Sequence, residues 1–190
     1  MPLNIWSVQL LCPHEEADNE LYRGVLTRAG MHQKTRLVLD IDCFYNMATE
    51  YLRCSKCGKK MVAWAHNIVS QLDRDRQLLF PAILTARYSC DKKVVGLLRQ
   101  RGLGNSSSMV RRQLEESHGD TYLRNVHHYL SACRTFKTAG SVGLVSASSI
   151  EEPPSLTPVP RHRWLMKVYQ LDVVSVLTML RPPSHHCLGM

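Results

Sequence analysis

The sequence lacks the features of a membrane-spanning or exported protein. None of its 190 residues belongs to an apolar run of 18 or more, so no segment is predicted to cross a bilayer. Residues 1–11 are apolar in patches, but they have neither a basic region nor a small-residue cleavage site, which argues against a signal peptide. We therefore expect a protein without a membrane partner, located in the nucleus or the cytoplasm.

The sequence also lacks the motifs of the common enzyme classes. No Ser-His-Asp order, no phosphate-cradling glycine loop and no pair of catalytic carboxylates stands out. Asp40 and Asp42 share one face of an expected strand, where a solvated edge is the better interpretation. We therefore expect a non-enzymatic protein that has no small-molecule substrate.

The seven cysteines form no even, regular disulfide framework. Without an export signal, this odd count favours reduced thiols, and closely spaced reduced thiols are more often metal ligands than disulfide partners. Cys54 and Cys57 form a Cys-x-x-Cys pair followed by Gly58, and a turn of this kind can hold a zinc ion from one side. A pair of free thiols is one alternative. A redox pair is another, with less support because no thioredoxin-like strand and helix surround the motif.

A closed zinc site needs two further ligands. The upstream candidates are Cys12 and His14, in the sequence Cys-Pro-His. A second knuckle would have a cysteine at the next position, where this chain has Glu15, so His14 or Glu15 would have to substitute. Cys43 is another candidate ligand. The predicted zinc ligands are Cys54, Cys57, Cys12 and His14.

The net charge of +8 is concentrated in one stretch of the chain. Residues 51–135 contain fifteen Lys and Arg against six Asp and Glu, whereas residues 1–50 contain four against seven. Residues 136–190 contain five against three. A concentrated positive field raises the affinity for polyanions, so we expect DNA as a partner. The alternative is a solvated basic surface that only keeps the protein soluble.

The hydrophobic patterning predicts strands first and helices afterwards. Strands are expected at about 35–41 and 45–53, joined by a turn near Asp42, and a third strand at 61–64 follows the Cys-x-x-Cys turn. This order of strand, cysteine turn and strand is typical of a zinc ribbon. A helical period begins near residue 67, and further helices are expected at 80–90, opened by Pro81, and at 91–101, 106–117 and 120–133.

Two of these helices form a helix-turn-helix candidate within residues 91–118. The segment 102–105 would provide the turn, and the second helix would enter the major groove of DNA. Ser106 and Ser107 at the start of that helix would meet phosphate, and its arginines would reach phosphates or guanine edges. The predicted contacts are Lys92, Lys93, Arg99, Arg101, Ser106, Ser107, Arg111 and Arg112. The alternative is an ordinary helical hairpin with solvated arginines.

These patterns predict an α+β protein. Residues 1–66 would form a small β zinc-ribbon-like part, packed against a helical part over 67–136 that contains the helix-turn-helix candidate. Residues 137–163 are rich in Ser, Thr, Gly and Pro, so we expect a flexible, disordered linker there. A terminal helix is expected over 164–181, followed by a disordered tail over 182–190.

Several segments together resemble one family. They are VLDIDCFYNMATEYLRCSKCGKKMVAWAHNIVSQLD, LFPAILTARYSCDKKVV, LLRQRGLGNSS and YLSAC, within about residues 36–133, with a weaker similarity in PPSLTPVPRHRWLMKVYQLDVVSVL. This is a mobile-element-derived family, catalogued as the domain of unknown function with number 6729. The resemblance implies a nuclear, transposon-derived, zinc-containing module.

The chain departs from the family's pattern in two places. Family members usually have a Cys-Pro-x-Cys knuckle upstream, of which this chain keeps Cys12 and Pro13, and they continue into a longer transposase-like region. Two alternatives to DNA binding therefore stay open. One is a protein-interaction scaffold, and the other is a degenerate product with no selected activity.

Overall fold

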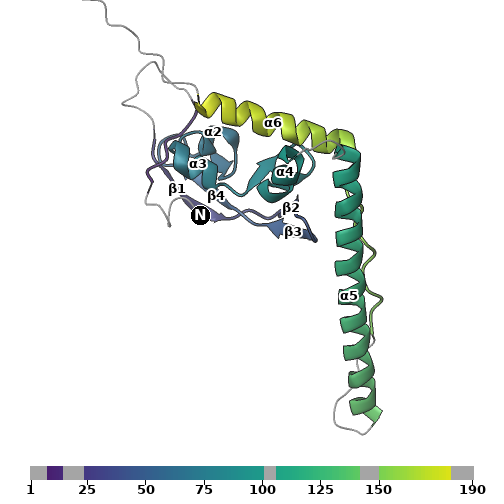
Figure 1. Ribbon diagram of the computed structural model, residues 1–190. Coiled ribbons are helices and arrows are strands. Elements are labelled where there is room, and N and C mark those ends of the chain that lie inside the picture. Colours follow the sequence, from purple (N-terminus) through teal and green to yellow (C-terminus); the bar gives the residue numbers. More distant parts are fainter. Residues whose placement is uncertain (1–7, 15–23, 101–105, 142–149, 181–190) are drawn as a thin grey trace, which may run out of the picture. The chain divides into compact units, whose positions relative to one another are not determined.

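The computed structural model describes residues 8–14, 24–100, 106–141 and 150–180, which form an α+β structure. Its elements, in chain order and labelled as in Figure 1, are β1 (Leu26–Met31), β2 (Arg36–Leu39), β3 (Phe44–Met47), β4 (Glu50–Cys54), β5 (Lys60–Val62), α2 (His66–Val69), α3 (Arg74–Leu79), β6 (Ala82–Leu84), β7 (Ser89–Asp91), α4 (Lys92–Arg99), α5 (Ser107–Ser141) and α6 (His162–Leu180). None of the described helices has both the length and the apolarity that a membrane crossing requires.

Two compact units make up the chain. The first unit contains residues 1–38, 46–89 and 177–190, and the second unit contains residues 39–45 and 90–176. Each unit therefore draws on residues from both sides of position 66, where the sequence pattern changes from strands to helices.

The first unit is built on a three-stranded antiparallel sheet with the order β1-β4-β5. Alternate residues of β4 face the interior, and α2 and α3 lie on one side of β1 and β4 (Figure 1). The buried core that results is apolar apart from two thiols. It consists of Leu10, Cys12, Leu26, Leu52, Cys54, Ala63, Ile68 and Leu72. Because both thiols belong to this core, the cysteines are positioned by the packing of the whole unit.

The predicted strands around the cysteine turn are confirmed in order but not in every boundary. The strand expected at 35–41 is present as β2, and the one expected at 61–64 is present as β5. The single strand expected at 45–53 is instead two strands, β3 and β4. They belong to different sheets, since β3 pairs within the order β3-β2-β7-β6, so the chain has to turn between them.

The predicted helix over 80–90 is wrong, because this segment forms β6 and β7. Phe80 is extended, with φ −64° and ψ 120°, and it ends α3. The ring of Pro81 disfavours the helical region for the residue before it, so the proline ends a helix here rather than beginning one. The backbone N–H and the hydroxyl of Thr85 both donate to the Tyr88 carbonyl oxygen, which closes the turn between the two strands.

The second unit contains α4 and the 35-residue helix α5. The predicted cap of α4 is confirmed, because the Asp91 carboxylate accepts a hydrogen bond from the Lys93 N–H at 2.9 Å. The hydroxyl of Ser106 accepts from the Met109 N–H at 3.3 Å, as expected for the residue that precedes α5. The predicted turn at 102–105 lies outside the described residues.

The predicted break at Gly119 and Asp120 is wrong, because α5 continues through both residues to Ser141. A glycine inside a helix costs only about 1 kcal/mol relative to alanine, which the hydrogen bonds on both sides of it outweigh. Residues 137–141 are therefore helical and not part of a linker, whereas 150–161 contain neither helix nor strand. The predicted terminal helix is confirmed as α6, and the predicted tail lies outside the described residues.

Replacing Gly119 with alanine should raise stability. A Cβ at this position would meet no atom within 4 Å, and alanine is favoured over glycine in a helix interior by about 1 kcal/mol. Urea unfolding of Gly119→Ala should show a higher midpoint, as should the matched variant Gly96→Ala in α4, where a Cβ also meets open space. A lower midpoint for Gly119→Ala alone would contradict a continuous α5.

Candidate metal centre

The turn that follows β4 presents Cys54 and Cys57. The Cys54 N–H donates to the Lys59 carbonyl oxygen and the Gly58 N–H donates to the Cys54 carbonyl oxygen, each at 3.1 Å. Gly58 has a φ of +68°, a conformation that side-chain-bearing residues rarely adopt, so glycine suits this position. The backbone N–H groups of Lys56 and Cys57 both point at the Cys54 Sγ, at 3.4 Å. The turn is therefore built to stabilise a negatively charged sulfur.

The third thiol comes from a segment far away in the sequence. Cys12 lies beside Gly24, whose carbonyl oxygen accepts its N–H at 2.9 Å, and Leu11 forms an isolated bridge with Val25. The side-chain amide of Gln71 donates to the Leu11 carbonyl oxygen and accepts from the Leu11 N–H, both at 2.8 Å. The side chain of Gln71 thus forms the pair of backbone hydrogen bonds that a neighbouring strand would form with Leu11. These bonds hold the segment that carries Cys12 in position.

The Sγ atoms of Cys12, Cys54 and Cys57 all lie within 4.8 Å of one another. The sulfurs of Cys12 and Cys57 are 3.6 Å apart. Two sulfurs that each lie 2.3 Å from a tetrahedral zinc ion are about 3.8 Å apart, so this spacing fits a shared metal. Cys12 and Cys54 are buried, whereas Cys57 is exposed. The three thiols can therefore bind a metal ion.

The other predicted ligands are placed differently. His14 lies beside the thiol cluster, with its Nδ1 3.3 Å from the Cys12 Sγ. It does not belong to the group of Cys12, Cys54 and Cys57, whose sulfurs are all within 4.8 Å of one another. Cys43 is exposed and belongs to the second unit, so it is not a ligand of this centre. Glu15 lies outside the described residues.

The thiols of Cys54 and Cys12 differ in their acidity. The N–H groups of Cys57 and Lys56 lower the pKa of Cys54 to about 7, against the opposing effect of burial. Burial raises the pKa of Cys12 to about 11. Of these two thiols, Cys54 is therefore the one more readily available as a thiolate at neutral pH. A metal ion bound there would also have to displace the proton of Cys12.

Gly24 is a further residue of this site that sequence reasoning missed. A Cβ at position 24 would approach the Cys54 Sγ more closely than real Cβ atoms do, and it would lie 3.1 Å from the backbone nitrogen of Lys56. Only glycine lets the segment that leads into β1, whose Gly24 carbonyl oxygen accepts the Cys12 N–H, pass this close to the cysteine turn. The sequence around Gly24 does not indicate a close contact with a distant segment, and the sequence around Gln71 does not indicate its hydrogen bonds to Leu11 either.

The residues predicted to contact DNA are mostly engaged with acidic side chains. Lys93 pairs with Asp40, Arg99 with Asp172, Arg111 with Glu115, and Arg112 with Glu116. Burial lowers the pKa of Lys92. Ser106 caps α5, Ser107 is its first residue, and Arg101 lies outside the described residues. Lys93, Arg99, Arg111 and Arg112 therefore each have an acidic partner within the chain.

The cations around the cysteine turn have a different environment. Arg53, Lys59 and Lys60 are exposed, and none of the three forms an ion pair with a described acidic residue. The Arg53 guanidinium lies over the turn, 3.8 Å from where a Cβ of Gly58 would be. The register of β4 and β5 places Arg53 directly opposite Lys60. The cluster of three thiols is therefore bordered by exposed positive charge that has no acidic partner among the described residues.

A pocket of about 470 Å³ lies in the second unit, along α5. Its lining includes the aromatic side chains of Phe44, Tyr122 and Tyr129. The acidic residues among those that line it are Asp42, Glu151 and Glu152, and no Lys or Arg contributes. A phosphate group would be repelled there, so this pocket is not a candidate site for nucleic acid.

The comparisons with known proteins identify the family. The family model described as "Domain of unknown function (DUF6729)" matches residues 1–174. The chain belongs to this family. The match confirms the family predicted from the residues and extends beyond the range 36–133 on which the resemblance was based. No curated protein and no solved structure matches this DUF6729 chain.

Proposed function

We propose that this DUF6729 chain is a non-enzymatic, zinc-containing DNA-binding module, derived from a mobile element and acting in the nucleus. The observation that carries the proposal is the presence of exposed cations without described acidic partners beside a cluster of three thiols. Such a combination joins a rigid, metal-stabilised turn to a surface that attracts phosphate.

Zinc is the metal that this donor set favours. Thiolate ligands with tetrahedral spacing select zinc over magnesium, calcium or manganese, which prefer oxygen ligands. His14 is the proposed fourth ligand, because its imidazole already lies beside Cys12. When bound, the ion would act as a structural cross-link, and Cys12, Cys54 and Cys57 would hold it without any catalytic step.

The cysteine turn is the proposed DNA contact, in preference to the start of α5. Binding to DNA depends largely on the release of counterions by cations that neutralise phosphates. A cation already paired with a carboxylate has to break that pair first, as Arg111 would with Glu115. Arg53, Lys59 and Lys60 carry no such cost from the described acidic residues.

The proposal is tested by titrating the zinc-loaded protein with a labelled duplex and with one of its strands over a series of salt concentrations. The logarithm of the affinity should fall linearly with the logarithm of the salt concentration. Lys59→Gln with Lys60→Gln should lower the affinity and reduce that slope by about 2. The matched pair Arg111→Gln with Arg112→Gln should stay close to wild type. Absence of binding, or binding indifferent to salt, would contradict the proposal.

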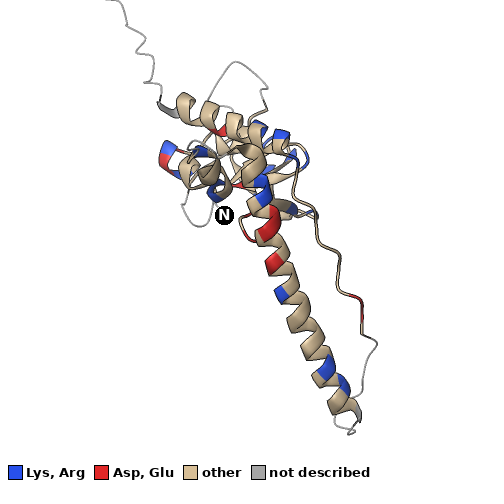
Figure 2. Ribbon diagram, turned by 45° about the vertical axis from the view of Figure 1, so that its right-hand side comes forward, with Lys and Arg blue, Asp and Glu red and all other residues tan. Residues whose placement is uncertain are grey.

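A protein-interaction scaffold is the second candidate, and one observation favours it. From its middle onward, α5 exposes several large apolar side chains, namely Leu123 just before the midpoint and Tyr129, Leu130 and Phe136 after it. Leu123 and Leu130 are seven residues apart and so lie on one face of the helix. Figure 2 shows that the acidic residues of α5 lie in its first half, so the Lys and Arg residues of its last turns have no acidic residue beside them on that helix. A failure of all nucleic-acid binding in a zinc-loaded, folded protein would favour this candidate.

A further inference from the structure

The outer face of the β1-β4-β5 sheet carries a line of aromatic rings. Tyr51 and Arg53 alternate with the buried residues of β4, so both face away from the core. The ring of His32, directly after β1, lies 4.8 Å from the ring of Tyr51 and 5.7 Å from that of Trp64, measured between centroids. The rings thus form a path of contacts from Trp64 through His32 to Tyr51, and each of the three side chains is half-buried.

Both ends of this aromatic path carry positive charge. At one end the Arg36 guanidinium lies over the Trp64 ring, 5.6 Å from its centroid. At the other end Tyr51 is followed by Arg53, which stands opposite Lys60. The aromatic path therefore leads directly to the exposed cations that border the cysteine turn.

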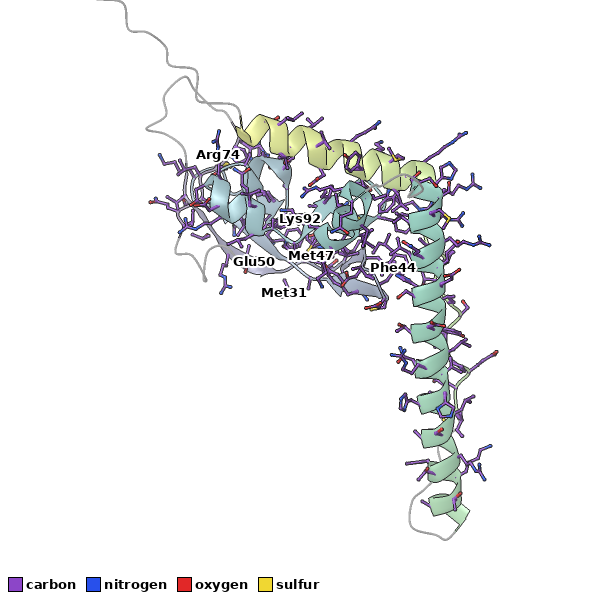
Figure 3. The ribbon with its side chains drawn as sticks, viewed as in Figure 1. Met31, Phe44, Met47, Glu50, Arg74 and Lys92 are labelled. Carbon is purple, nitrogen blue, oxygen red and sulfur yellow. The ribbon has the colours of Figure 1, made fainter. Side chains whose placement is uncertain are left out.

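Negative charge is directed away from this face. The strands β1, β4 and β5 contain a single acidic residue, Glu50 (Figure 3). Its side chain lies on the opposite, buried side of β4, where it pairs with Arg28 at 2.9 Å. The outer face thus combines aromatic rings with cations that have no ion-pair partner among the described acidic residues, and these strands offer no carboxylate to repel a phosphate there.

We propose that this face binds single-stranded DNA, with bases stacking on Trp64, His32 and Tyr51 and with phosphates contacting Arg53 and Lys60. Unpaired bases expose their faces, and aromatic side chains stack on them with little regard to sequence. In a duplex the same faces are hidden inside the base stack, so duplex DNA would gain only the contacts to phosphate. The inference rests on the proposed function, and it specifies which form of DNA that function recognises.

The experiment uses the zinc-loaded full chain in which Trp6 and Trp164 are replaced by phenylalanine, so that Trp64 is its one remaining tryptophan. Titration with a single-stranded oligothymidine should quench the Trp64 fluorescence, because a base that stacks on the indole alters its environment. The same oligonucleotide annealed to its complement should bind more weakly and quench less. An unquenched signal in the presence of tight single-strand binding would overturn the proposal.

Substitution provides the second measurement. Trp64→Ala and Tyr51→Ala should each weaken single-strand binding by roughly 5- to 150-fold, with a much smaller effect on the duplex. Trp64→Phe, which keeps an aromatic face, should retain most of the affinity. Zinc content and unfolding temperature are measured for each variant, so that a folding defect in Trp64→Ala is recognised and the comparison with Trp64→Phe and Tyr51→Ala decides the result.

The outcomes separate this inference from the function on which it rests. If Lys59 and Lys60 govern a salt-dependent affinity but the aromatic variants bind both forms of DNA like wild type, the stacking proposal is wrong and the DNA-binding function stands. If neither form of DNA is bound, both proposals fail together.

Discussion

Replacing Cys54 with serine should abolish stoichiometric zinc binding. The wild-type chain is expected to retain about one equivalent of zinc after gel filtration, since three thiols already stand at the spacing of a tetrahedral site. The pKa of Cys54 is lowered to about 7, and its Sγ accepts two backbone N–H groups. Its loss therefore removes the ligand that is best prepared to bind the ion. Metal content by mass spectrometry measures the effect.

Loss of the metal should also destabilise the first unit. Two of the three thiols belong to its core, so an ion that binds only the folded state adds its binding free energy to folding. We expect Cys54→Ser, or treatment of the wild type with a chelator, to lower the unfolding free energy by roughly 3 kcal/mol or more. This corresponds to a fall of about 6–12 °C in the unfolding temperature.

Two control variants sharpen this prediction. Cys43→Ser should keep the full zinc content, because Cys43 is exposed and lies in the other unit. His14→Ala should weaken binding without abolishing it if the imidazole is the fourth ligand. Zinc far below one equivalent in the wild type, or full zinc in Cys54→Ser, would show that the thiol cluster is not a metal site.

Replacing Gly24 with alanine should weaken zinc binding although position 24 is not a ligand. The added Cβ would overlap the Cys54 Sγ, so either the sulfur or the strand beside Cys12 has to move. The φ of Gly24 is not in the left-handed region, and alanine therefore meets no backbone strain there. An overpacked core typically costs about 1–3 kcal/mol, which corresponds to a roughly 5- to 150-fold loss of zinc affinity.

Competition with a chromophoric chelator measures the zinc affinity of Gly24→Ala. The matched control is Gly96→Ala, where a Cβ meets nothing within 4 Å, and it should bind zinc like the wild type. A wild-type affinity in Gly24→Ala would mean that the thiol cluster tolerates displacement. In that case the close approach of the two segments would not be needed to hold the ion.

Local patterns predicted the parts of the site that are local in sequence. The Cys54-x-x-Cys57 turn between two strands follows from four adjacent residues and the alternation on either side of them. Cys12 was found from its residue type and the proline that follows it. Gly24 and Gln71 were missed because their roles depend on contacts with segments tens of residues away, and neither residue type indicates such a contact on its own.

The errors in the fold have the same origin. Pro81 is compatible with the first turn of a helix, but its effect on Phe80 ends α3, and pairing between strands determines the conformation of 82–91. A glycine ends a helix where its neighbours are weakly helical. The helical segments on both sides of Gly119 are long enough for α5 to continue through it. The charge pattern correctly located the basic stretch, but it did not reveal which cations had acidic partners.

The distance along the chain between the thiols gives the centre one more property. Cys12 and Cys54 are 42 positions apart, so an ion held by both closes a large loop, as a disulfide between them would. In the chain-entropy treatment of cross-links, a loop of this size restricts the unfolded ensemble by about 4 kcal/mol. Unlike a disulfide, this cross-link would form and open with the supply of free metal and would need no oxidant. Metal availability would therefore set how firmly the segment 8–14 is held in the first unit.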